Sequence, residues 1–82
     1  MMLLREEVMQ QQDHRIEAFA QAAFHVRQGH AVVARQRVLV ERLERDGRDA
    51  ASARVLLKQF SGSLENFEED YSRLKSELEH AS

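Results

Sequence analysis

The chain contains no cysteine, no proline and no tryptophan, and only three of its 82 residues are glycine. Without cysteine there is no disulfide framework, no thiolate metal site and no cysteine nucleophile. Without proline, the strongest helix-breaking residue is absent, so long continuous helices are permitted. A chain of this length has room for one domain, which buries only about 60% of the surface that its unfolded state exposes. We therefore expect one small helical domain that associates with a partner.

Long hydrophobic runs and a large charge of one sign are also lacking. The apolar residues 1–4 are followed at once by Arg5, so we expect neither a signal peptide nor a membrane span, no membrane partner, and a cytoplasmic location. The formal net charge is −2, whereas nucleic-acid-binding domains usually carry a large basic excess. These features argue against nucleic-acid binding as the main function.

Motifs for catalysis or cofactor binding are missing as well. No nucleophile is paired with a base, and there is no glycine-rich phosphate loop. His14 with Glu17 and Glu77 with His80 resemble a metal-binding arrangement, but the histidines fall outside the apolar pattern of the helices. We therefore expect no enzyme activity, no cofactor and no metal.

Gly47 marks the clearest turn, because it stands between Asp46 and Asp49. Glycine can adopt the left-handed conformation that ends a helix, and Asp49 can accept hydrogen bonds from the first amides of the next helix. The sequence predicts a single all-α domain: a helix over about 3–46, a turn at 46–49 and a helix over about 50–80.

Both predicted helices carry an apolar stripe with alternating spacings of three and four residues, which is typical of a heptad seam. In the second helix it comprises Ala50, Ala53, Leu57, Phe60, Leu64, Phe67, Tyr71, Leu74 and Leu78. In the first it comprises Phe19, Ala22, Val26, Gly29, Val33, Gln36, Val40 and Leu43, with Ile16, Ala23, Val32, Leu39 and Leu56 widening the two stripes. We expect the stripes to face each other in an antiparallel hairpin.

An antiparallel hairpin about Gly47 predicts which parts of the seam meet. The region of Val33 and Gln36 is expected opposite Phe60 and Leu64. Gln36 is a polar residue on the seam, and two interpretations stay open: its amide fixes register or oligomeric state, or it reaches solvent at the edge of the seam.

Two hairpin helices alone bury too little apolar surface to offset the entropy of ordering the chain. One solution is an unbroken first helix, with two hairpins pairing as a homodimer into a four-helix bundle. The alternative is a monomeric three-helix bundle with a break near Gly29. We favour the unbroken helix, because no capping residue and no proline follow Gly29.

The charge distribution predicts how two hairpins pair. Residues 35–58 at the hairpin tip carry seven basic and four acidic side chains, whereas residues 61–82 carry two basic and six acidic ones. An antiparallel dimer places the basic tip of each hairpin beside the acidic residues 61–82 of the other, so we expect that orientation.

Two sets of residues are candidates for binding a further protein. Antiparallel pairing leaves the first 14 residues without an intrachain partner, which exposes Leu4, Val8 and Met9. The tip carries Arg35, Arg37 and Arg42, which suit an acidic protein or phosphates.

Between His25 and Leu78 the sequence resembles a group of short bacterial proteins that have no assigned activity and are predicted to form helical hairpins. The resemblance is carried by His25-Val26, Gly29, Ala34-Arg35-Gln36-Arg37, Leu43-Glu44-Arg45-Asp46-Gly47, Leu56-Leu57, Phe60, Ser63-Leu64 and Arg73-Leu74. It implies a continuous first helix and a bacterial cytoplasmic origin, and it implies no ligand. The sequence as a whole indicates a non-catalytic protein-protein interaction or scaffold module that self-associates through its seams. The alternative is a small regulator, antitoxin-like or nucleic-acid-binding, that uses its basic tip.

Overall fold

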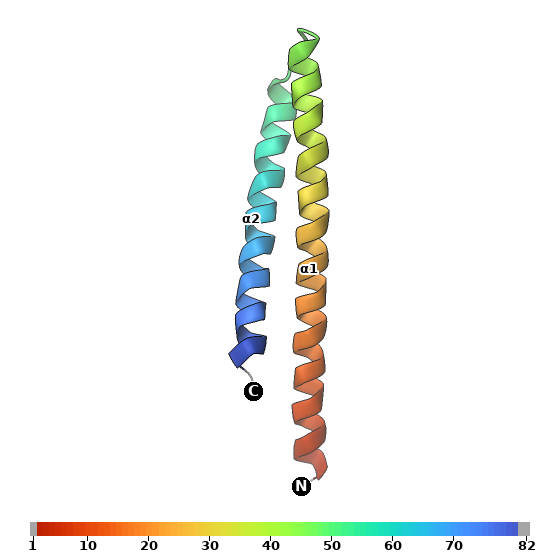
Figure 1. Cartoon of the computed structure of the whole chain (residues 1–82), viewed down its shortest axis with the longest axis vertical. Coiled ribbons are helices and arrows are strands. Elements are labelled where there is room, and N and C mark those ends of the chain that lie inside the picture. Colours follow the sequence, from red (N-terminus) through yellow and green to blue (C-terminus); the bar gives the residue numbers. More distant parts are fainter. Residues whose placement is uncertain (1, 81–82) are drawn as a thin grey trace.

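The protein is an antiparallel hairpin of two long helices (Figure 1). The computed structural model describes the backbone of residues 2–80 and the side chains of residues 14–80. Helix α1 spans Met2–Arg45 and helix α2 spans Ala51–His80. The hairpin measures 69 × 16 × 14 Å, and the N-terminal end of α1 continues beyond the C-terminal end of α2 (Figure 1). The predicted all-α helical hairpin is confirmed.

Helix α1 runs without a break through Gly29. The three-helix alternative, which required the chain to turn back near Gly29, is therefore wrong. The physical reason lies in the packing: a Cβ atom at Gly29 would stand 2.9 Å from Cδ1 of Leu64, so this glycine admits a side chain of α2 rather than ending α1. Neither a capping residue nor a proline follows it to stop the helix.

The end of α1 is a Schellman motif built on Gly47. Gly47 has a φ of 69°, the left-handed conformation that glycine adopts without a steric penalty. Its amide donates to the carbonyl of Glu44 at 3.1 Å, and the amide of Arg48 donates to the carbonyl of Leu43 at 2.8 Å. These bonds satisfy carbonyl groups that have no partner inside the helix, so the chain reverses direction with few unpaired backbone groups.

The start of α2 is fixed by Asp49. Its carboxylate Oδ1 accepts a hydrogen bond of 2.9 Å from the amide of Ala51. Across the turn, Nη1 of Arg54 lies 2.8 Å from Oε1 of Glu44. Both groups are exposed, so this pair contributes little to stability, and the cap is the stronger determinant of where α2 begins.

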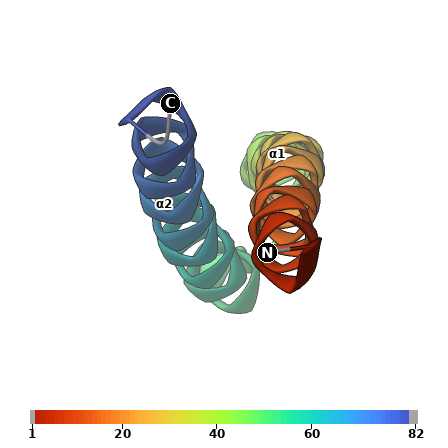
Figure 2. The same cartoon turned by 90° about the horizontal axis from the view of Figure 1, so that it is seen from below.

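The size of the seam side chains sets the separation of the helices. Near the turn the seam is filled by Val40, Ala50 and Ala53, all buried, and the ribbons lie close together (Figure 1). Toward the open end it is filled by rings: Phe19 stacks on Tyr71 with centroids 5.0 Å apart. Because larger side chains hold helix axes further apart, α2 inclines away from α1 (Figure 2).

The contacts in the middle of the hairpin agree with the expected register. Leu64 packs against Gly29, and this is the register that places Val33 opposite Phe60. The missing side chain of Gly29 makes room for Leu64.

Candidate interaction surface

One side of the hairpin is hollowed into an apolar groove between the helices, with a cavity of about 300 Å³ that is open to solvent. Its lining, which we call the groove, consists of His25, Gln28, Gly29, Val32, Phe60, Ser63, Leu64 and Phe67. None of these eight residues is an aspartate, glutamate, lysine or arginine. An uncharged apolar hollow of this kind suits an apolar side chain of a partner.

Helical periodicity continues the groove toward the turn. Leu39 lies seven residues after Val32, and Leu56 lies seven residues before Ser63, so each falls on the same flank of its helix as the groove. Leu39 is 42% exposed and Leu56 is 43% exposed. The uncharged surface therefore follows both helices for several turns.

The opposite side of the hairpin is charged. There Nε2 of His30 lies 3.6 Å from Oε1 of Glu68, and Glu44 pairs with Arg54. At about 100° per residue, His30 and Val32 fall on opposite flanks of the buried line of α1. The two sides of the hairpin thus differ in kind: polar pairs connect the helices on one side, and apolar side chains line the other.

His25 forms one edge of the groove. Its ring stacks on Phe67 with centroids 5.0 Å apart and an interplanar angle of 17°, and it makes an edge contact with Phe24 at 5.9 Å. The side chain of His25 is exposed. Its stacked ring therefore extends the apolar wall of the groove.

Of the seventeen seam residues, the twelve that are expected to form the core or the dimer seam are all buried or half-buried. Val33, Val40 and Leu64 are buried. The other nine, which are half-buried, are Val26, Gln36, Leu43, Leu57, Phe60, Phe67, Tyr71, Leu74 and Leu78. For Gln36, Nε2 donates a hydrogen bond of 2.9 Å to the carbonyl of Ala53, so its amide links the two helices. Among residues 14–80, six are buried, and Leu64 is the largest of them.

The candidate partner-binding residues do not form one surface. Arg35, Arg37 and Arg42 are exposed, but Arg37 lies about 200° around α1 from Arg35, whereas Arg42 shares the side of Arg35. The side chains of Leu4, Val8 and Met9 lie outside the described residues. Sequence reasoning missed Gln28 and Ser63 as groove residues, because polar residues do not contribute to an apolar pattern.

Three further observations concern the part of the chain that the structure describes. Among those residues no three His, Cys, Asp or Glu side chains gather in a way that could hold a metal ion. Neither described helix has a stretch long and apolar enough to cross a bilayer. On the surface of α2, Arg73 donates hydrogen bonds to the carboxylates of Asp70 and Glu77, and these bonds raise the pKa of its guanidinium.

Comparison with family models, with curated proteins and with solved structures gave no match.

Proposed function

We propose that this protein is a non-catalytic protein-protein interaction module that self-associates. In this proposal the groove of one hairpin covers the groove of a second, and the four helices form an antiparallel bundle. The observation that carries the proposal is the difference between the two sides of the hairpin: an apolar groove on one side, and on the other the polar contact of His30 with Glu68 and the ion pair of Arg54 with Glu44. Apolar seams of this type are the usual contact surfaces of four-helix bundles.

The exposed area supports a partner of substantial size. The hairpin exposes 6769 Å², whereas a compact monomer of 9.5 kDa exposes only about 5,000 Å². The excess, about 1,700 Å², is larger than the ~800 Å² that each partner buries in a standard interface. A second hairpin laid along the groove has the length needed to cover this surface.

The charges favour an antiparallel arrangement of the two copies. The tip, residues 35–58, carries a net charge of +3, and residues 61–82 carry −4. Antiparallel copies place each tip beside the acidic end of the other, whereas parallel copies place like charges together. Exposed charges contribute little stability individually, so they select the orientation, and burial of the groove drives association.

A pair of neighbouring leucine and valine positions tests the proposal. Leu56→Glu places a charge on the groove side, and Val55→Glu, the matched control, places it on the outer side of α2, where Val55 is 56% exposed. We expect sedimentation equilibrium to give twice 9.5 kDa for the wild type and for Val55→Glu. We expect Leu56→Glu to lose the dimer, because burial of an unpaired carboxylate opposes association.

Far-UV circular dichroism accompanies this measurement, because the separated chains of Leu56→Glu either stay helical or unfold. Both results agree with a dimer held by the groove. A wild-type chain that remains a helical monomer at millimolar concentration refutes self-association. Equal loss of the dimer in both variants would place the contact elsewhere.

The alternative, a small regulator that binds nucleic acid with its basic tip, has less support, because Arg37 faces away from Arg35 and Arg42. A mobility shift with DNA or RNA at low salt that disappears when all three arginines are neutralised would favour it. Absence of a shift at low salt removes it.

A further inference from the structure

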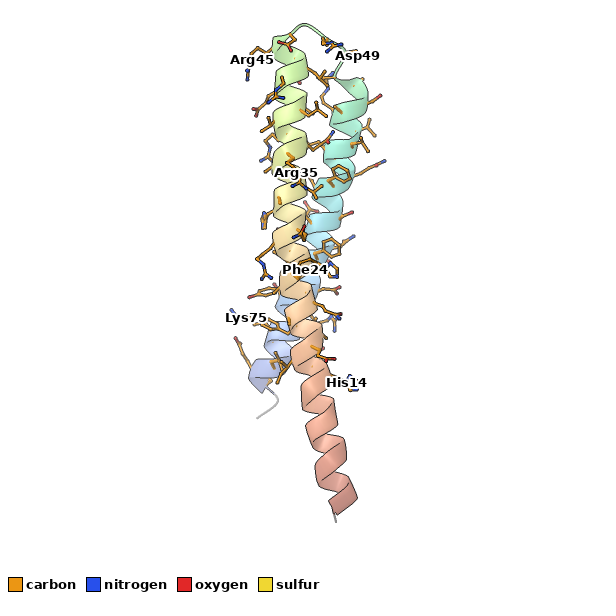
Figure 3. All side chains as sticks on the ribbon, turned by 90° about the vertical axis from the view of Figure 1, so that its right-hand side faces the viewer. His14, Phe24, Arg35, Arg45, Asp49 and Lys75 are labelled. Carbon is orange, nitrogen blue, oxygen red and sulfur yellow. The ribbon has the colours of Figure 1, made fainter. Side chains whose placement is uncertain are left out.

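A second apolar surface lies on the side of α1 that is turned away from α2. Phe24, Ala31 and Val38 recur every seven residues, so they form a line along the helix, which we call the outer stripe. At about 100° per residue, this line lies opposite the buried Val33 and Val40. Phe24 and Val38 are each 49% exposed. Figure 3 looks onto this side of the hairpin, with α1 in front of α2 and Phe24 labelled.

Arginines border the outer stripe. Arg27, Arg35 and Arg42 are exposed, and none of them forms an ion pair with another residue among those described. Between residues 24 and 42 the single acidic residue is Glu41, at one edge. The stripe thus combines an apolar line about 21 Å long with positive charge on its borders.

We propose that the outer stripe binds an amphipathic helix with acidic flanks from a partner protein. Complementary charge selects this occupant. A second copy of the same stripe is disfavoured, because it would bring Arg27 and Arg35 against arginines of equal charge. Helix-in-groove recognition of this type uses apolar anchors at heptad spacing, and charged flanks set orientation and partner choice.

The side chains of the stripe fit a helix better than a lipid surface. Its centre is Ala31, and the neighbouring Ala20 and Ala34 are also small and lie beside the stripe. Small residues let two helix backbones approach closely, whereas membrane-surface helices depend on large buried side chains. The proposal is independent of self-association, since the outer stripe and the groove occupy different sides of α1.

The test uses a defined probe: a fluorescent 21-residue peptide with leucine and alanine at its heptad core positions and glutamate on both flanks. The matched probe has lysine in place of every glutamate. We expect fluorescence anisotropy with the full chain to show micromolar binding of the acidic peptide that weakens with salt. The lysine peptide should bind at least tenfold more weakly.

Variants of the chain locate the contact. Two variants should each weaken binding of the acidic peptide at least tenfold. The first is Phe24→Ser, and the second is a triple variant that combines Arg27→Gln, Arg35→Gln and Arg42→Gln. Val55→Ser, an equally exposed position on α2, should leave it unchanged. Phe24→Ser should keep the helicity and oligomeric state of the wild type, so failure of this proposal is distinguishable from failure of self-association.

Several outcomes overturn the proposal. It is wrong if the acidic peptide does not bind, or if its binding is unchanged in Phe24→Ser and in the triple arginine variant. The same variants are also tested with phosphatidylglycerol-phosphatidylcholine vesicles and with a 20-base-pair DNA duplex. If one of these binds through the outer stripe and the peptide does not, the surface serves a membrane or a nucleic acid instead.

Discussion

At the scale of single residues, the three glycines have three different surroundings. Gly29 is a contact point for Leu64, and Gly47 adopts a left-handed backbone conformation in the turn. Gly62 lies within α2 with nothing within 4 Å of the position that a Cβ atom would take. Glycine therefore allows close packing at position 29 and chain reversal at position 47. At position 62 it lowers helix stability, and no contact of the structure requires it there.

We expect Gly62→Ala to raise the free energy of unfolding by about 0.5–1 kcal/mol, because alanine loses less backbone entropy in a helix than glycine. Urea denaturation followed by circular dichroism measures this change. Gly29→Ala should gain less, since its methyl group must displace Cδ1 of Leu64.

Gly47→Ala is the opposite control. A side chain at φ 69° is strained, so this variant should lose about 1 kcal/mol. Stabilisation by Gly47→Ala, or destabilisation by Gly62→Ala, would contradict the assignment of the turn and of the open surface.

At the scale of elements, the two helices and the turn follow from local sequence signals. The seam of α2 repeats without interruption over nine residues. Gly47 signals the end of α1, and Asp49 signals the start of α2. The groove does not follow in the same way. The apolar seam has two similar flanks, and the sequence pattern does not say which of them forms the groove; the contacts of the folded hairpin decide this.

The cap of α2 gives a prediction at this scale. Asp49→Ala should lower the free energy of unfolding by about 1 kcal/mol, because the amide of Ala51 loses its carboxylate acceptor. Asp46→Ala is the matched control: Asp46 stands at the C-terminal end of α1, where the helix dipole disfavours a negative charge, so its removal should be neutral or slightly stabilising. Thermal denaturation of both variants at equal concentration tests this. Equal losses would mean that Asp49 does not act as a cap.

At the scale of the whole molecule, the hairpin is extended. Its radius of gyration is 19.0 Å, whereas a compact domain of 82 residues has about 12 Å. All the buried residues except Leu64 are alanine or valine, so the interior between two helices is thin. These properties support the proposal that the hairpin is one half of a larger assembly.

The distance between the two tips of the proposed dimer tests this account most directly. The chain has no cysteine, so Arg48→Cys provides a single site for a spin label in the exposed turn. In the antiparallel bundle the two turns lie at opposite ends of the 30-residue α2, which is about 45 Å long. We therefore predict that double electron-electron resonance will give a label separation on the order of 45 Å. A separation below about 20 Å, which is less than half the length of α2 and indicates parallel hairpins, or a complete absence of dipolar coupling at high concentration, would contradict the account.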